Sequence, residues 1–358
     1  DINQNIIMAN QRKKVRILSI DGGGIRGVIP GVILSVLEQN IQQICGNKNA
    51  RLADYFDLMA GTSTGGILSA CYLLPQSRES QKAKFSAAEI VDLYFQHGEE
   101  IFARPFFHKI RSAGGILDEK YPAKGLKKTL KKYMGDTWMS DLIKPSLITA
   151  YDIERRKAHF FTQQDAKQKG KNFLVRDAVW STAAAPTYFE CTNIKDDLKR
   201  DYALIDGGVY ANNPTLCAYA EARSLFKKPD TQKAVTAADM LILSVGTGND
   251  KKTYPYQKAK NWGQAEWVKP IIDIMMSGVA ETVDYQVRQI YDAIEHSSNY
   301  LRVDAPLPNT VNHDMDDASE ENMQALKKQG ELVAQKFKKQ LEDFAKTIVE
   351  TDGCERIY

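Results

Sequence analysis

The segment ILSIDGGGIRG, residues 17–27, places three consecutive glycines directly after a run of strand-forming residues. The residues before the glycines, VRILSI (15–20), predict a buried strand. VIPGVILSVLEQNIQQIC (28–45) repeats apolar residues at helical spacing and predicts a helix. Several adjacent glycines at one turn indicate a need for bare backbone N–H groups, which can hold either a phosphate or the oxyanion of an ester under cleavage.

A second unit of strand, turn and helix follows: YFDLMAG (55–61), TSTGG (62–66) and ILSACYLLP (67–75). Two such units in series predict an α/β domain. Residues 85–140 look helical, and the stretch 320–350 predicts one amphipathic helix. Further strands are predicted in PSLITAYDI (145–153), KAHFFT (157–162), YALIDGG (202–208) and MLILSVGTG (240–248).

No linker or repeat divides the chain, so we expect a single domain at 15–350, an N-terminal extension at 1–14 and a tail at 351–358. The net charge of +3 is too small to indicate a nucleic acid polymer as partner. Five scattered cysteines without a CxxC pair indicate reduced thiols and no zinc site. No apolar run suggests a membrane span or a signal peptide, which favours a cytoplasmic protein.

The glycines Gly22, Gly24 and Gly27 satisfy the GxGxxG pattern of dinucleotide-binding proteins. That interpretation requires an acidic residue about 20 positions on, to bind the ribose. The segment there, ICGNKNAR (44–51), contains no Asp or Glu, which disfavours a dinucleotide site. A P-loop is excluded too, because no GK[ST] follows. An oxyanion hole at a helix N-terminus is the remaining interpretation, which the glycines alone do not decide.

The pentapeptide Gly61-Thr62-Ser63-Thr64-Gly65 matches GxSxG between an apolar strand and an apolar helix. The small Gly61 and Gly65 would allow the sharp elbow that exposes a nucleophilic serine above a sheet. A plain Gly/Ser turn is the alternative, and the surrounding strand and helix weaken it. Together with the upstream glycines, this motif predicts Ser63 as the nucleophile of an acyl transfer reaction.

A serine nucleophile needs a base, and none of the five histidines, His97, His108, His159, His296 and His313, lies at a strand end bounded by glycine. By contrast, YALIDGGVYANNP (202–214) places Asp206 at a strand end before two glycines. Such a carboxylate would share with Ser63 the carboxyl edge of the sheet, where open α/β sheets bind ligands. Because a carboxylate is a weak base, it would need contact with the hydroxyl in a partly desolvated site. We therefore predict a Ser63–Asp206 dyad.

The chain resembles the patatin-like phospholipases, a family of lipid acyl hydrolases. The motifs that carry this resemblance occur in family order between residue 15 and about residue 330: IDGGGIRGVIP, ADYFDLMAGTSTGG, STAAAPTYF, IDGGVYANNP, LSVGTG and MDDASEENM. The resemblance implies a three-layer α/β/α sandwich with a mainly parallel sheet, and it assigns Ser63 as nucleophile and Asp206 as base. It also assigns the oxyanion hole to the backbone of Gly22, Gly23 and Gly24, with Arg26 bracing the loop.

The resemblance implies an acyl ester of a glycerophospholipid as substrate, no metal or cofactor, and peripheral contact with membranes. It leaves any small-molecule activator unidentified. The alternatives are a storage or scaffold protein of the same fold and, less favoured, a dinucleotide-binding oxidoreductase. Two stretches mix basic and apolar residues in a way that suits either a bilayer interface or an ordinary helix, RPFFHKIRSAGGIL (104–117) and KGLKKTLKKYM (124–134).

Overall fold

The computed structural model describes residues 14–102, 124–228, 231–249 and 253–351. The expected extension and tail therefore lie outside the described residues except for Lys14 and Thr351, as does RPFFHKIRSAGGIL (104–117). The strands are β1 (Val15–Ile20), β2 (Leu58–Gly61), β3 (Ser146–Asp152), β4 (Lys157–Thr162), β5 (Thr192–Lys195), β6 (Asp201–Asp206), β7 (Met240–Val245) and β8 (Tyr300–Val303).

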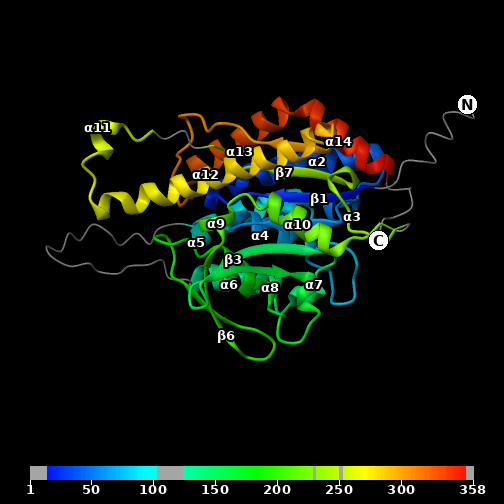
Figure 1. Cartoon of the computed structure of the whole chain (residues 1–358), viewed down its shortest axis with the longest axis horizontal. Coiled ribbons are helices and arrows are strands. Elements are labelled where there is room, and N and C mark those ends of the chain that lie inside the picture. Colours follow the sequence, from blue (N-terminus) through cyan, green and yellow to red (C-terminus); the bar gives the residue numbers. More distant parts are fainter. Residues whose placement is uncertain (1–13, 103–123, 229–230, 250–252, 352–358) are drawn as a thin grey trace, which may run out of the picture.

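In the described ranges, α-helices follow β1 and β2, as the two predicted strand–helix units require, while β3 leads directly into β4 and β5 into β6 (Figure 1). The bounds of the helices are α2 (Val28–Cys45), α3 (Leu52–Tyr55), α4 (Thr64–Leu73), α5 (Ala87–Phe102), α6 (Lys124–Met134), α7 (Gln163–Ala166), α8 (Val175–Thr182), α9 (Gly208–Ala211), α10 (Thr215–Leu225), α11 (Tyr256–Ala259), α12 (Gln264–Asp292), α13 (Glu320–Lys336) and α14 (Lys338–Glu350).

Within the described ranges the strands form one sheet in the order β5-β6-β3-β2-β1-β7-β8, with β4 paired to β3. The central pairs β3–β2, β2–β1, β1–β7 and β7–β8 are parallel, which confirms the predicted mainly parallel sheet. The pairs β3–β4, β3–β6 and β5–β6 are antiparallel. The strand that carries Asp206 therefore runs against its neighbour β3, which the sequence did not reveal.

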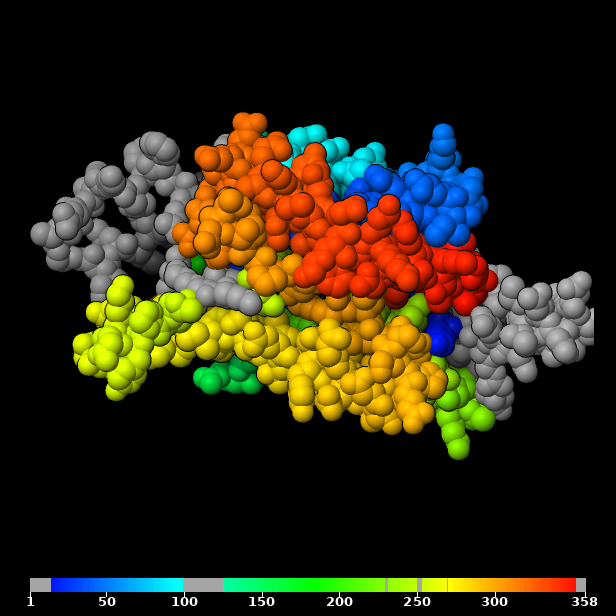
Figure 2. Space-filling model, turned by 90° about the horizontal axis from the view of Figure 1, so that it is seen from above, coloured from blue at the N-terminus to red at the C-terminus, as the bar shows by residue number. Residues whose placement is uncertain are grey.

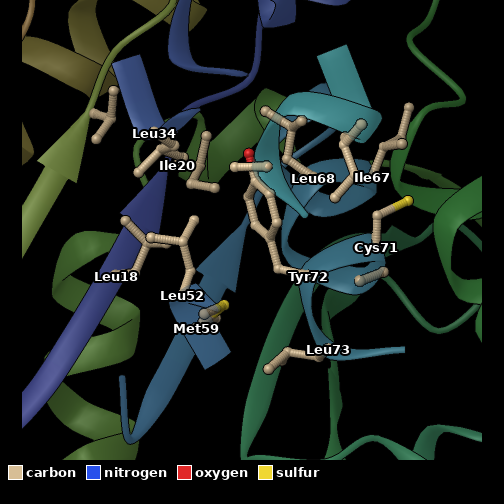
Figure 3. Close-up of a cluster of buried hydrophobic side chains, with 14 of the residues drawn as sticks. Leu18, Ile20, Leu34, Leu52, Met59, Ile67, Leu68, Cys71, Tyr72 and Leu73 are labelled. Atoms are coloured by element: carbon tan, nitrogen blue, oxygen red, sulfur yellow. The ribbon is translucent and has the colours of Figure 1, made fainter. Parts of the chain in front are cut away.

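Side chains alternate across the sheet and build two cores. On one face, Leu18 and Ile20 of β1 pack with α2, α4, α13 and α14; Figure 3 shows them beside Leu68 and Tyr72 of α4. On the other face, Val15 and Ile17 pack against α10 and α12. Since parallel sheets need cover on both faces, the result is the predicted three-layer α/β/α sandwich.

The predicted single helix at 320–350 is wrong in one respect, because α13 ends at Lys336 and α14 begins at Lys338. Phe337 between them leaves the helical region with φ −99° and ψ 17°. Both segments pack on α2, so the bend keeps the apolar stripe against the core. The helical prediction for 85–140 holds for α5 and α6, while Met139–Asp141 form only a 3₁₀ turn.

Two strand ends meet along β3, and this meeting positions the candidate site. Gly61, the last residue of β2, pairs with Ile148, and Asp206, the last residue of β6, pairs with Ala150. β4 occupies one edge of β3 from Leu147 to Asp152, so β2 and β6 divide the other edge and approach each other from opposite directions. The residues that follow Gly61 thereby come beside Asp206.

Candidate active site

The turn between β2 and α4 is a sharp elbow with Ser63 at its apex. Ser63 has φ 53° and ψ −124°, a backbone conformation that residues other than glycine rarely adopt. A Cβ on Gly61 would collide with the carbonyl oxygen of Gly65, and a Cβ on Gly65 would collide with that of Ile20. The two glycines therefore let the elbow close on itself and on β1. The Ser63 N–H donates to Thr182 Oγ1 at 2.8 Å, which holds the strained residue in place.

The glycine loop after β1 lies directly beside the elbow, because a Cβ on Gly22 would be 3.3 Å from Ser63 Cβ. The Gly22 N–H donates to the carbonyl oxygen of Asn212 at 3.0 Å. Within the described residues, no group accepts a hydrogen bond from the N–H of Gly23 or Gly24. The loop thus leaves two backbone donors unused and one committed to the protein.

Arg26 supports this loop from within the 3₁₀ turn Gly24–Gly27. Its side chain is buried, and Nε donates to the carbonyl oxygen of Gly23 at 3.3 Å. Fixing the Gly23 carbonyl also fixes the plane of the peptide that carries the Gly24 N–H. The bracing role that the resemblance implied for Arg26 stays a prediction.

Asp206 is buried at the end of β6, and its Oδ1 accepts a hydrogen bond from the Gly208 N–H at 2.6 Å. Burial raises the pKa of Asp206 to about 7, while the Gly208 N–H and then the Ser63 side chain act to lower it. Oδ2 makes no hydrogen bond of normal length to the described residues. The Ser63 side chain lies near enough to Asp206 to influence its pKa, but no hydrogen bond of normal length joins the two side chains.

Hydrogen bonds that the sequence did not predict lock the elbow to the Asp206 turn. Thr62 Oγ1 lies 2.7 Å from Thr149 Oγ1 of β3 and 2.6 Å from the carbonyl oxygen of Ala211 on α9. Thr149 also limits the Asp206 turn, because a Cβ on Gly207 would collide with Thr149 Oγ1. Thr62, Thr182 and Ala211 lie within motifs quoted above, although no role was predicted for them, whereas Thr149 lies in a predicted strand that carried no motif.

A buried ion-pair network lies behind the glycine loop. Arg302 of β8 donates from Nη1 to Asp21 Oδ1 at 2.9 Å and from Nη2 to Asp304 Oδ2 at 3.0 Å. Burial raises the pKa of Asp21 to about 6, although Arg302 acts to lower it. Since Asp21 immediately precedes Gly22, this network fixes the start of the loop.

Two hollows flank α12 near these residues. A small pocket of about 130 Å³ is lined by Asp21, Asn212, Thr247 and Met276, among others. A larger groove of about 830 Å³ runs between α12, α10 and the end of α9, and its lining includes Tyr210 and Ala211. Both hollows therefore reach the segment 210–213 that follows Asp206, although neither lining includes Ser63 or Asp206 themselves.

The described histidines stay outside the Ser63–Asp206 contact. His159 is enclosed by Phe161, Phe173 and Tyr202, and burial lowers the pKa of its ring to about 4. His97 contacts Tyr133 at 2.7 Å. His313 lines the small pocket, and its Nε2 lies 3.3 Å from the carbonyl oxygen of Pro308. His108 lies outside the described residues.

Neither a metal-binding cluster nor a membrane-spanning helix is found among the described residues. They contain no group of three or more His, Cys, Asp or Glu side chains placed to hold a metal ion. None of their helices combines the length and apolar character that crossing a membrane requires.

The sequence profile described as patatin-like phospholipase matches residues 18–219. Patatin-04/09 from Solanum tuberosum is 35% identical over 340 residues, which cover 92% of this chain and 86% of that protein. Patatin-like protein 2 from Oryza sativa subsp. indica is 36% identical over 345 residues, which cover 90% of this chain and 84% of that protein. The crystal structure of VipD from Legionella pneumophila aligns with 92% of this chain and 67% of that chain, at 12% identity and a TM-score of 0.36.

Proposed function

The chain belongs to the patatin-like phospholipase family of lipid acyl hydrolases, and we propose that it cleaves acyl esters of glycerophospholipids through a Ser63–Asp206 dyad. The observation that carries this proposal is the strained elbow that places Ser63 beside a buried carboxyl whose pKa burial raises to about 7. A base with a pKa near neutrality combines a useful deprotonated fraction with adequate basicity.

In the first half of the reaction, Ser63 Oγ attacks the ester carbonyl carbon while Asp206 accepts the hydroxyl proton. The carbonyl oxygen becomes an oxyanion, and the N–H groups of Gly23 and Gly24 donate to it. The tetrahedral intermediate collapses, the bond to the alcohol oxygen breaks, and Asp206 returns its proton to the departing lysophospholipid. Ser63 is left acylated.

In the second half, water attacks the acyl carbon while Asp206 accepts a water proton. Collapse of this second intermediate breaks the bond to Ser63 Oγ, which takes the proton back from Asp206. The products are a free fatty acid and the regenerated enzyme. Every proton thus passes through one carboxyl group, and no histidine is needed.

The Gly22 N–H enters this mechanism differently from the sequence-based expectation, because it already donates to Asn212. We assign Gly22 the role of permitting close approach between the loop and Ser63, where a side chain would collide with Asn212 Oδ1. Gly23 and Gly24 remain as the proposed oxyanion donors, braced by Arg26. The cytoplasmic location stays a prediction.

The test is to incubate the purified protein with phosphatidylcholine vesicles and to measure fatty acid and lysophospholipid by mass spectrometry. We expect equal amounts of both products and a loss of roughly 10³-fold or more in Ser63→Ala. Folded wild-type protein that releases no fatty acid would contradict the proposal and favour the storage or scaffold alternative.

A further inference from the structure

The first half of α12 exposes a continuous apolar stripe. Its members follow the i, i+3, i+4, i+7 spacing of one helical face, and each is between 39% and 47% exposed: Trp267, Val268, Ile271, Ile274 and Met275. A solvent-facing helical surface normally carries polar side chains. About two and a half turns of large apolar side chains on such a surface therefore indicate a binding surface.

The same face of α12 becomes more polar in its second half. Thr282, Gln286 and Gln289 are exposed there, and Tyr285, which is 65% exposed, is the one large ring among the described residues of that part of the face. Gln289 lies 18 residues after Ile271, about five helical turns, and so occupies the same angular position. Burial against the core cannot explain the stripe, because the core side of this helix carries Met276, Ala280 and Val287 instead.

The segment before α12 extends the stripe with aromatic and basic residues. Trp262 packs edge-on against Trp267 at 5.0 Å between ring centroids. Tyr256 of α11 is 75% exposed, and the neighbouring Lys258 and Lys260 are exposed as well. Aromatic rings with an apolar body and a polar tip, accompanied by lysines, suit the interface between water and a bilayer.

The position of the stripe connects it to the candidate active site. Figures 1 and 2 show α11 and the start of α12 (yellow) projecting from one end of the molecule, and α9 lies toward the same end in Figure 1. Ile274 and Met275 belong both to the stripe and to the wall of the 830 Å³ groove, which reaches Tyr210 and Ala211 of α9. An apolar path therefore runs from the exposed helix toward the turn that follows Asp206.

We propose that α11 and the first half of α12 form the surface by which this protein docks on a phospholipid layer, with the groove beneath Ile274 and Met275 open to the lipid. The choice of a phospholipid layer as the partner rests on the proposed function. The helix lies in the plane of the interface, and its stripe enters the boundary between headgroups and acyl chains. A second copy of this chain is the competing occupant.

The test uses Ile271→Glu, because Ile271 is exposed, belongs to the stripe and lines neither hollow. Gln289→Glu places the same charge on the same face outside the stripe and is the matched control. In a Ser63→Ala background, which prevents lipid breakdown, we measure sedimentation with vesicles of phosphatidylcholine, with and without phosphatidylglycerol. Each substitution is also made alone, in protein that retains Ser63. The rate of hydrolysis of these variants is measured on the same vesicles and on a soluble short-chain nitrophenyl ester.

We expect Ile271→Glu to weaken vesicle binding and vesicle hydrolysis by roughly tenfold or more, because an apolar anchor is replaced by a charge. Hydrolysis of the soluble ester should stay within about twofold of wild type, and Gln289→Glu should behave as wild type. Unchanged vesicle binding in Ile271→Glu overturns the proposal. So does a wild-type dimer that this substitution dissociates. Absence of all ester hydrolysis would refute the proposed function, while sedimentation would still decide the docking surface.

Discussion

The N–H of Gly22 donates to the carbonyl oxygen of Asn212 at 3.0 Å, which ties the loop after β1 to the helix after Asp206. Thr62 of the elbow makes a second tie to the same helix through the Ala211 carbonyl oxygen. The proposed oxyanion donors, nucleophile and base thus share one rigid frame, although they come from three separate strand ends. Such preorganisation is what electrostatic stabilisation of a transition state requires.

The elbow predicts a contrast between two inactive variants. Ser63→Ala and Ser63→Gly should both abolish labelling by a fluorophosphonate probe, because each lacks the hydroxyl. Ser63→Ala retains the strained φ of 53°, whereas glycine adopts that conformation freely. We expect Ser63→Gly to be the more stable variant by about 1 kcal/mol, measured by urea denaturation. Labelling that persists in Ser63→Ala would place the nucleophile elsewhere.

The raised pKa of Asp206 predicts the acid limb of the pH–rate profile. As the base, Asp206 must be deprotonated, so kcat/KM on a soluble ester should fall as the pH drops below about 7. The profile should keep this limb when His313, the histidine that lines the small pocket, is replaced by alanine. A profile that is flat across this region would exclude Asp206 as the titrating base.

Asp206→Asn should lose nearly all activity and gain stability above pH 7. The native carboxyl holds its proton up to about pH 7, whereas in the unfolded chain its pKa returns to the ordinary value of 3.8. Between these values the native state binds more protons, so the free energy of unfolding falls as the pH rises. The amide of Asp206→Asn does not ionise, so this variant avoids the loss of stability that wild type suffers when the buried carboxyl becomes charged. Thermal unfolding at about pH 8 measures the difference, and a marked drop in Tm would contradict it.

The network of Arg302, Asp21 and Asp304 predicts a large stability effect behind the site. Arg302→Met leaves the buried Asp21 without its cation, and we expect a loss of about 3 kcal/mol in the free energy of unfolding. The loss should be smaller at about pH 5 than at about pH 8, because protonation of Asp21 removes the unpaired charge.

Lys195→Met is the matched control for that substitution. Its ion pair with Asp201 is more than half exposed on both sides, so its removal should cost less than about 1 kcal/mol. Equal losses in the two variants would show that the buried network has no special role in stability.

Much of this arrangement could be predicted from local sequence. The elbow around Ser63 and the loop at Gly22 have short motifs, because each requires glycine at fixed positions where a Cβ would collide. The direction of β6 could not be predicted in this way. Asp206 would end its strand equally well in a parallel or an antiparallel neighbour of β3, and only the pairing decides which.

The remaining omissions have similar causes. Thr149 of β3 and Thr182 of α8 fix the elbow, but nothing local marks their role: Thr149 lies in an ordinary strand, and the motif STAAAPTYF that contains Thr182 does not say which of its residues contacts Ser63. The sequence did not predict the helix α12. It carries apolar residues on an exposed face as well as on its buried face, so they do not show the one-sided spacing of an amphipathic helix. A proline within it, Pro270, also obscures the helical signal.

The last prediction concerns the glycine loop itself. A Cβ on Gly23 would collide with Thr247 Oγ1, which donates to the Gly22 carbonyl oxygen at 2.8 Å. Gly23→Ala must therefore tilt the loop and misdirect the donors without deleting an N–H. If those donors meet only the charged oxygen of the transition state, kcat falls while KM changes little.

The loss in Gly23→Ala should be smaller than the roughly 2.7–4 kcal/mol that removal of a whole oxyanion donor costs. Arg26→Lys should lower kcat in the same direction, because lysine lacks the Nε–H that donates to the Gly23 carbonyl oxygen and cannot reproduce the planar guanidinium geometry. Steady-state kinetics on a soluble nitrophenyl ester measures both variants after circular dichroism has established their fold. If Gly23→Ala raises KM and leaves kcat intact, the loop binds the ground-state substrate and its glycines are not an oxyanion hole.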